Sequence, residues 1–231
     1  MQTYRLRLSI LLLTLVGLGL LLNLSHLDLR FSEQLADGLN GFVYSKHWFF
    51  DNVLHIYAAR LTAILGLGLL IFNAWQALAP SANRKIIVVF RYIMFSWLSS
   101  LAVISVLKRI TTLPCPWDLK QFGGMADYLT IEKMFSSMYE VGECFPAAHS
   151  SGGYGFICLG FVALALGKPM YKGFLCAVIV GLVYGGAQII RGAHFISHDL
   201  FTIAICLAFA WFWAEFYLFR FNAFHLVETT K

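Results

Sequence analysis

Long apolar runs separated by short polar stretches dominate this chain. An α-helix needs about 17 to 25 residues to cross the hydrocarbon core of a membrane. Six of the runs have this length, and each is nearly free of charge inside. This pattern predicts an all-α integral membrane bundle of six transmembrane helices, which forms a single domain over residues 1-231. The predicted spans are 6-24, 58-79, 86-107, 150-167, 172-190 and 200-219.

The first apolar run, Leu8 to Leu24, follows Arg5 and Arg7 and therefore has the beginning of a secretory signal peptide. It is longer than the apolar core of a signal peptide, and no cleavage site of the Ala-x-Ala kind follows it. We therefore expect a retained first span.

The composition agrees with a membrane protein. Hydrophobic residues make up 59% of the chain and charged residues 13%, and the mean hydropathy is +0.73, whereas soluble domains are about half apolar and about a quarter charged. The net charge of +5 would suit a nucleic-acid partner, but the basic residues occur in twos and threes between apolar runs. Such charges set membrane topology, so we expect no nucleic-acid partner.

Six spans place both chain ends on one side of the membrane, and the groups of basic residues on that side have few acidic residues among them. The positive-inside rule makes this side cytoplasmic and leaves residues 25-57, 108-149 and 191-199 outside. The basic residues concerned are Arg5, Arg7, Arg84, Lys85, Lys168, Lys172, Arg220 and Lys231.

The external segments differ in character. Segment 25-57 contains Trp48, Phe49 and Phe50 beside charged neighbours, which predicts a short interfacial helix in the headgroup region. Segment 108-149 is the longest polar piece, and its prolines and adjacent glycines predict an external long loop. It also holds Cys115 and Cys144, which an oxidising exterior would allow to form a disulfide.

Three polar clusters lie at external membrane boundaries, where the topology brings them to one face of the bundle. A single ionisable residue at such a boundary is often only an anchor, but three clusters on one face, two with histidines, indicate a site. The clusters are Lys108 and Arg109; Pro146, His149, Ser150 and Ser151; and Arg191, His194, His198 and Asp199.

These clusters have the chemistry of a phosphate site. Lys108, Arg109 and Arg191 supply fixed positive charge, and the start of the fourth predicted span offers unpaired backbone N–H groups with the Ser150 hydroxyl nearby. Two histidines then suit phosphoryl transfer, in which one attacks phosphorus and the other protonates the leaving oxygen.

The clusters resemble the signature of the type 2 phosphatidic acid phosphatase superfamily, integral-membrane lipid phosphatases whose phosphate pocket is shared with vanadium haloperoxidases. That signature is a lysine, six residues and Arg-Pro; then Pro-Ser-Gly-His; then Ser-Arg, five residues, a histidine, three residues and an aspartate. The corresponding residues here are Lys108 with Cys115-Pro116, Pro146-Ala147-Ala148-His149, and a third part centred on His194.

The resemblance implies a role for each conserved position. His194 would be the nucleophile that forms a phosphohistidine, His149 the acid that protonates the leaving group, and Lys108 a ligand of the phosphate oxygens. It implies no metal and no cofactor. Several positions depart from the signature, and the residues there are Cys115, Ala147, Ala148, Gln188 and His198.

Nearby residues could replace the missing groups. Arg191 lies one helical turn after position 188 and on nearly the same face, so we expect its guanidinium to reach the phosphate. Asp199 lies one residue past the expected carboxylate and could orient His194. His198 is the alternative orienting residue.

The expected function is that of a metal-independent lipid phosphatase, which removes phosphate from a phosphomonoester or diphosphate head group. Its partners would be a phosphorylated membrane lipid and the bilayer, with the site on the periplasmic side of a bacterial inner membrane. Undecaprenyl diphosphate, phosphatidylglycerol phosphate, phosphatidic acid and lipid A are all open as substrates. The alternatives are a phosphotransferase acting between lipids and a non-catalytic phospholipid-binding relative; the soluble haloperoxidases do not fit this chain.

Overall fold

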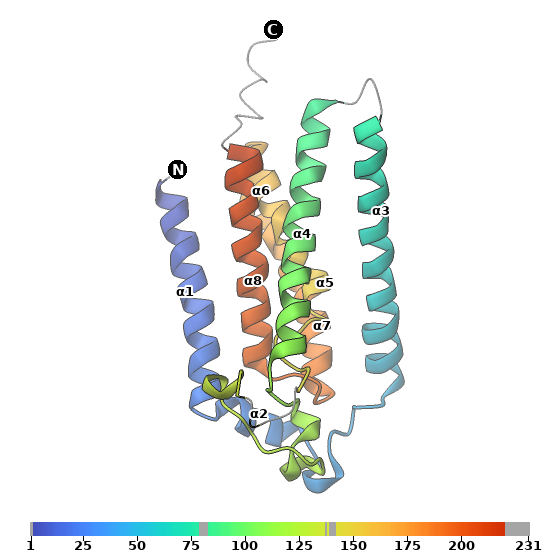
Figure 1. Ribbon diagram of the computed structural model, residues 1–231, viewed down its shortest axis with the longest axis vertical. Helices are drawn as coiled ribbons and strands as arrows, with labels where there is room; N and C mark the ends of the chain where they lie inside the picture. The colour runs from blue at the N-terminus through green and yellow to red at the C-terminus, as the bar shows by residue number, and fades with distance from the viewer. Residues whose placement is uncertain (1, 79–82, 137, 139–141, 220–231) are drawn as a thin grey trace.

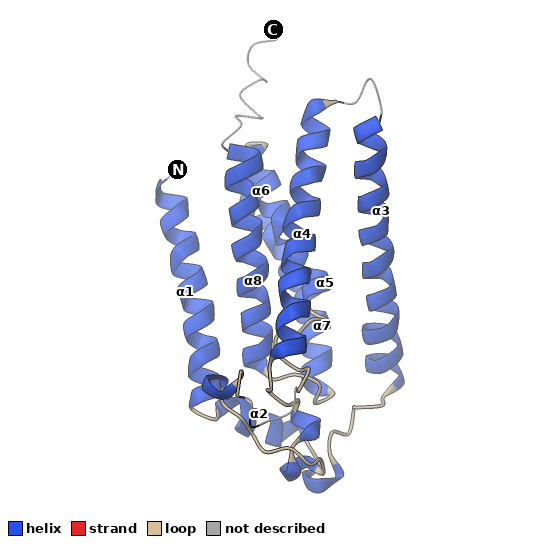
Figure 2. Cartoon of the chain, viewed as in Figure 1, coloured by secondary structure: helices blue, strands red, loops and turns tan. Residues whose placement is uncertain are grey.

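The computed structural model describes residues 2–78, 83–136, 138 and 142–219, and this part of the chain is helical with no strand (Figure 2). Five helices are long and apolar enough to cross a membrane, which confirms an all-α protein with the character of an integral membrane protein. The five candidate spans are Thr3–Leu24, Phe49–Leu78, Arg84–Ile110, Met170–Ile190 and Ile196–Phe219.

Helix α8 packs against α1, α4 and α6, while α7 packs against α5 and α6 and α3 packs against α4. The short helix α2, the long loop after α4 and the turn between α7 and α8 gather at one end of the bundle (Figure 1). The helices are α1 (Gln2–Leu24), α2 (Leu27–Leu35), α3 (Ala58–Leu78), α4 (Arg84–Ile110), α5 (Ser151–Tyr154), α6 (Cys158–Ala165), α7 (Met170–Ile190) and α8 (Ile196–Ala214).

The predicted span 150-167 differs from the other five. It consists of α5, a 3-10 turn at Gly155–Ile157 and α6, which together form a shorter apolar run, Ser151–Ala165. Gly167, with a φ of 68°, and Pro169 directly after this run prevent the helix from continuing. The prediction of six full-length spans is therefore not confirmed.

The prediction of a separate interfacial helix around Trp48 needs correction. Phe49–Tyr57 forms a π-helical segment that runs directly into α3, and the two make one candidate span, Phe49–Leu78. The charge of Asp51 is tolerated at the start of this span because the carboxylate pairs with Arg191. The short separate helix of this external segment is α2 instead.

Of the basic residues that we expect on the cytoplasmic side, those that the structure describes lie at the end of the bundle opposite α2, near the start of α1, the start of α4 and the turn between α6 and α7 (Figure 1). They are Arg5, Arg7, Arg84, Lys85, Lys168 and Lys172, while Arg220 and Lys231 lie outside the described residues.

The core between α4, α6 and α8 contains the large buried side chains of Tyr92 and Phe161. The Tyr92 hydroxyl shares its one proton between the carbonyls of Cys158 (3.2 Å) and Ala210 (3.0 Å). This shared bond joins α4, α6 and α8 through one side chain and satisfies its only polar group.

Candidate active site

A cavity of about 510 Å³ lies at the end of the bundle that carries α2 and the long loop. Lys108, His149 and His194, one from each of the three polar clusters, all line it. The other described residues that line it are His55, Cys115, Trp117, Asp118, Gly142, Glu143, Ala148, Gln188 and Ala193. The structure thus gathers a cation and three imidazoles, counting His55, around one space.

A larger hollow, of about 760 Å³, lies at the opposite end between α1 and α8. Apart from the ion pair between Arg5 and Glu215 (2.7 Å), the described side chains that line it are largely apolar. It contains none of the polar clusters, so its size does not make it the candidate site.

Lys108 lies in the last turn of α4 and is half-buried at the cavity wall. The carbonyl end of a helix favours a cation, which helps to keep this ammonium group in place. Arg109, the next residue, is exposed and is not among the residues that line the cavity.

His194 is placed by the turn that ends α7. Gly192 has a φ of 76°, and the Ala193 amide then donates to the Gln188 carbonyl at 2.8 Å, as in a helix end closed by a left-handed residue. A Cβ at position 192 would collide with the ring of Phe42, so only glycine fits. The chain turns back and buries His194, which is 6% exposed.

Helix α2 holds the other side of this turn. Oδ1 of Asp28 accepts a hydrogen bond of 3.0 Å from the Ser197 amide, in the first turn of α8. A carboxylate is a good partner for the unpaired N–H groups and positive dipole of a helix start. Burial raises the pKa of Asp28, while its bonds to Ser197 act in the opposite direction.

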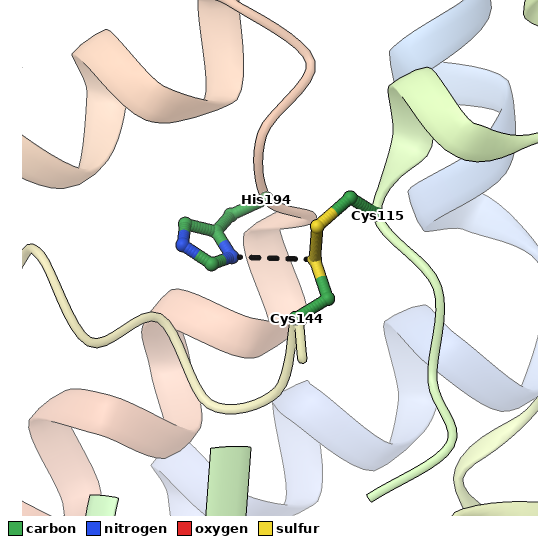
Figure 3. Close-up of side chains that lie close together, drawn as sticks. All are labelled: Cys115, Cys144 and His194. Atoms are coloured by element: carbon green, nitrogen blue, oxygen red, sulfur yellow. Dashed lines mark hydrogen bonds between the residues drawn. A yellow bond between two sulfur atoms is a disulfide. The ribbon is translucent and has the colours of Figure 1, made fainter. Parts of the chain in front are cut away.

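Cys115 and Cys144 form a disulfide, and Nδ1 of His194 lies 3.5 Å from Sγ of Cys144 (Figure 3). A disulfide sulfur has no hydrogen, so Nδ1 must carry the proton in this contact. We therefore assign the tautomer in which Nε2 keeps its lone pair. Burial, followed by the nearby His198 and Lys108, holds the pKa of His194 well below its usual value, so the ring is neutral.

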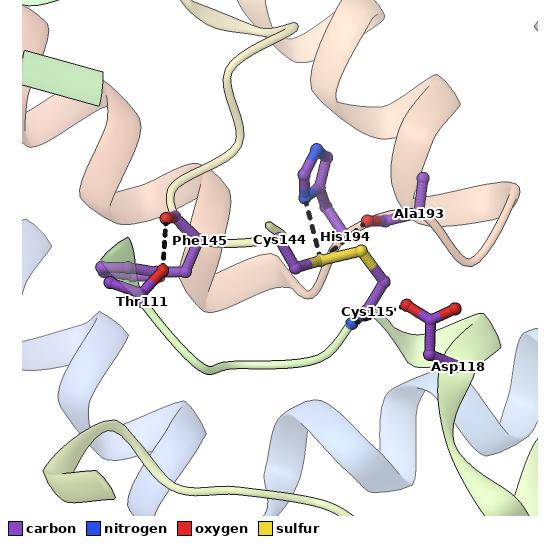
Figure 4. Close-up of a disulfide and its surroundings, with 7 residues drawn as sticks. All are labelled: Thr111, Cys115, Asp118, Cys144, Phe145, Ala193 and His194. Carbon is purple, nitrogen blue, oxygen red and sulfur yellow. Dashed lines mark hydrogen bonds between the residues drawn. A yellow bond between two sulfur atoms is a disulfide. The ribbon is translucent and has the colours of Figure 1, made fainter. Parts of the chain in front are cut away.

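The disulfide also joins the loop after α4 to the segment before α5 (Figure 4). Sγ of Cys144 is 3.1 Å from the Ala193 carbonyl, and the Cys115 amide donates to Asp118 at 3.3 Å. The two sulfurs and a nitrogen of His194 lie within 4.8 Å of one another, but sulfurs bonded to each other are not thiolate ligands for a metal.

His149 lies before α5, and its Nε2 donates to the Leu54 carbonyl at 2.7 Å. Its ring centroid is 5.0 Å from that of His55 and 5.5 Å from that of Tyr184. Burial lowers the pKa of His149 to about 4, with further lowering from positive neighbours that include Lys108. The ring is therefore neutral at pH 7, and Nδ1 is the nitrogen left for proton transfer.

Arg191 ends α7, and the structure does not bring it to the cavity wall. Its guanidinium donates to the Ser45 carbonyl at 3.1 Å, to Oε1 of Gln188 at 3.0 Å and to Oδ1 of Asp51 at 2.5 Å. Gln188 itself lines the cavity. Arg191 thus fastens the segment before α3 to the third cluster.

Asp199 and His198 do not orient His194 in this structure. Oδ2 of Asp199 accepts a hydrogen bond of 2.6 Å from the Tyr154 hydroxyl. The ring centroid of His198 is 6.0 Å from that of His194, and its buried Nδ1 has no hydrogen-bond partner within the described ranges. Neither residue lines the cavity.

Ser150 is fully buried below the cavity. Its hydroxyl donates to the Ala147 carbonyl at 3.0 Å, and it is not a lining residue. His55, by contrast, lines the cavity although the sequence analysis did not single it out. Its only signal in the sequence is its spacing of four residues from Asp51 in an external aromatic segment.

Comparison with known proteins gives one match. The family model of the PAP2 superfamily matches residues 90–222, more than half of the chain. None of the curated proteins and none of the solved structures compared with the chain matches it. The matched region contains all three polar clusters and leaves out α1, α2 and α3. With its apolar helices and one residue of each cluster at the same cavity, the chain belongs to the PAP2 superfamily, whose members are phosphatases that act on phosphorylated lipids in membranes.

Proposed function

We propose that the protein is a lipid phosphatase that hydrolyses a phosphomonoester or diphosphate in a lipid head group through a phosphohistidine at His194. One observation carries the proposal: Lys108, His149 and His194, from three separate parts of the chain, line the same cavity. A fixed cation, an imidazole that can attack phosphorus and a second imidazole that can transfer protons are sufficient groups for phosphoryl transfer through a phosphohistidine.

The residues divide the reaction between them. Nε2 of His194 attacks phosphorus while the Lys108 ammonium group balances the charge of the phosphate oxygens. His149 first gains a proton on Nδ1 and then gives it to the leaving oxygen as the P–O bond breaks. Water then attacks the phosphohistidine, His149 takes up the proton of that water, and the P–N bond breaks to release phosphate and free His194.

The test is a phosphate-release assay on purified protein in detergent, without added metal. The substrates are undecaprenyl diphosphate, phosphatidylglycerol phosphate, phosphatidic acid and lipid A. We expect release from at least one of them and none above background with His194→Ala. His47→Ala is the matched control because His47 is exposed and does not line the cavity. Undiminished release by His194→Ala would rule out the nucleophile.

We also propose that the cavity opens on the outer, periplasmic side of a bacterial inner membrane. The support is the group of basic residues at the opposite end of the bundle, which have few acidic residues among them; those described are Arg5, Arg7, Arg84, Lys85, Lys168 and Lys172. Lys46 and Lys172 are exposed near opposite ends. In intact spheroplasts, a membrane-impermeant maleimide should label Lys46→Cys, and it should label Lys172→Cys only after permeabilisation. The reverse pattern would place the cavity inside.

A further inference from the structure

The segment before α3 contributes a histidine to the cavity although it lies outside the family match. His55 belongs to the π-helical segment Phe49–Tyr57. π-Helical turns are rare in proteins, and those that occur are often found at functional sites. Its ring is the one nearest to His149, with 5.0 Å between centroids. The preceding residue, Leu54, accepts the hydrogen bond from His149. One turn of helix therefore both fixes His149 and places a second imidazole beside it.

His55 is itself held by charged residues. Its Nδ1 is buried, forms no hydrogen bond within the described residues and lies 3.5 Å from Oδ1 of Asp51, four residues earlier. The same carboxylate oxygen pairs with Arg191. An aspartate beside Nδ1 keeps a proton on that nitrogen and leaves Nε2 to exchange protons. The series Arg191, Asp51, His55 and His149 thus links the third cluster of the signature to the proposed acid.

The three histidines of the cavity differ in their exposure to solvent. The His55 side chain is 43% exposed, whereas His194 is 6% exposed and His149 is half-buried with Nε2 committed to a carbonyl. His149 must gain a proton before it can protonate a leaving oxygen, and it must lose one after it has activated water. His55 is the imidazole through which that proton can reach the solvent.

Resting on the proposed function, we propose that His55, oriented by Asp51, is the proton-relay residue of this site. In the first step, Nε2 of His55 takes a proton from bulk water and gives it to Nδ1 of His149, which passes it to the leaving oxygen as the P–O bond breaks. In the second step, the proton taken from the attacking water returns through His149 to His55 and leaves to bulk water. The charged and titratable groups that face His55 are Asp51, Arg191, Lys108 and His149.

The relay can be separated from a structural role by the choice of leaving group. An alkoxide needs a proton to leave, whereas para-nitrophenolate does not. With His55→Gln we expect kcat on the active lipid phosphate to fall by about tenfold or more with KM nearly unchanged, and kcat on para-nitrophenyl phosphate to change by less than about threefold. His47→Gln, a substitution at an exposed histidine of the same segment, should match the wild type on both substrates.

Chemical rescue gives a second, independent readout. Millimolar imidazole should restore much of the lost lipid phosphatase activity to His55→Ala and none to His194→Ala. Equal losses on both substrates that imidazole does not restore, or no loss in either variant, would overturn the relay while leaving the lipid phosphatase in place. A wild-type protein that releases phosphate from none of the four lipids would instead refute the proposed function.

Discussion

Nδ1 of His194 lies against a disulfide sulfur, 3.5 Å from Sγ of Cys144, and not against a carboxylate. This contact assigns the proton to Nδ1 and leaves Nε2 free, which is the requirement for a nucleophilic imidazole. The cysteine that replaces the signature arginine at position 115 is the other half of the same disulfide. Cys115 therefore contributes to the disulfide that contacts the His194 ring.

The first prediction concerns this disulfide. Under denaturing, non-reducing conditions, alkylation should label three of the five cysteines, namely Cys158, Cys176 and Cys206, and all five after reduction. The double variant Cys115→Ser, Cys144→Ser should unfold more easily, by about 2–4 kcal/mol, and should lose phosphatase activity because the His194 turn loosens. Intact mass after alkylation is the measurement, and five labelled thiols without reductant would contradict it.

The second prediction is a loss of stability in acid through His149. Its folded-state pKa of about 4 lies below the value of about 6.5 for an unfolded histidine. Between these values the unfolded chain binds the proton and the folded chain does not, so stability falls as pH falls from 6.5 towards 4. The contribution of His149 to this loss should reach about 2–3 kcal/mol at pH 4.5.

The matched variant for this test is His149→Gln, since a glutamine amide can still donate to the Leu54 carbonyl. Thermal unfolding in detergent at pH 7 and pH 4.5 gives the comparison. The variant should lose less stability than the wild type over this interval. If both proteins lose the same amount, His149 does not cause the acid sensitivity.

The third prediction concerns the cap that α2 provides for α8. Asp28→Ala removes the acceptor of the Ser197 amide, so it should lower the free energy of unfolding by about 1–2 kcal/mol and reduce activity by loosening the turn that carries His194. Asp127→Ala is the control, because the ion pair of Asp127 with Lys120 is exposed and contributes little. Equal effects of the two substitutions on unfolding would argue against the cap.

The sequence indicated which residues would meet because topology depends on a few long-range rules. Apolar length and basic loop charges were enough to expect Lys108, His149 and His194 at one end of one bundle, and all three line one cavity. The same external loop was expected to hold both Cys115 and Cys144. None of these inferences depends on how a helix is rotated about its axis.

Side-chain partners depend on that rotation and on neighbours far away in the chain. The sequence places the guanidinium of Arg191 at the phosphate, whereas in the structure it donates hydrogen bonds to Ser45 and Asp51. Asp51 belongs to the segment Phe49–Tyr57, so the same bond holds the start of the helix that continues into α3. His55 reaches the cavity only because that helix start is placed there. From hydropathy alone the segment Phe49–Tyr57 is predicted to be interfacial, because Asp51 is charged. The ion pair of Asp51 with Arg191, 140 positions away in the chain, cannot be detected from the neighbouring residues in the sequence.

The last prediction concerns Asp199, which lies next to the position where the signature has its carboxylate. Its bond to the buried Tyr154 hydroxyl and its absence from the cavity wall favour a packing role. Tyr154→Phe should therefore lower the free energy of unfolding by about 1–3 kcal/mol, because the buried carboxylate loses its donor. Asp199→Asn keeps an acceptor oxygen and should cost less. Both variants should keep kcat on the lipid phosphate within about threefold of wild type. A fall of about 100-fold in kcat with unchanged stability in Asp199→Asn would show that this carboxylate orients His194 during the reaction.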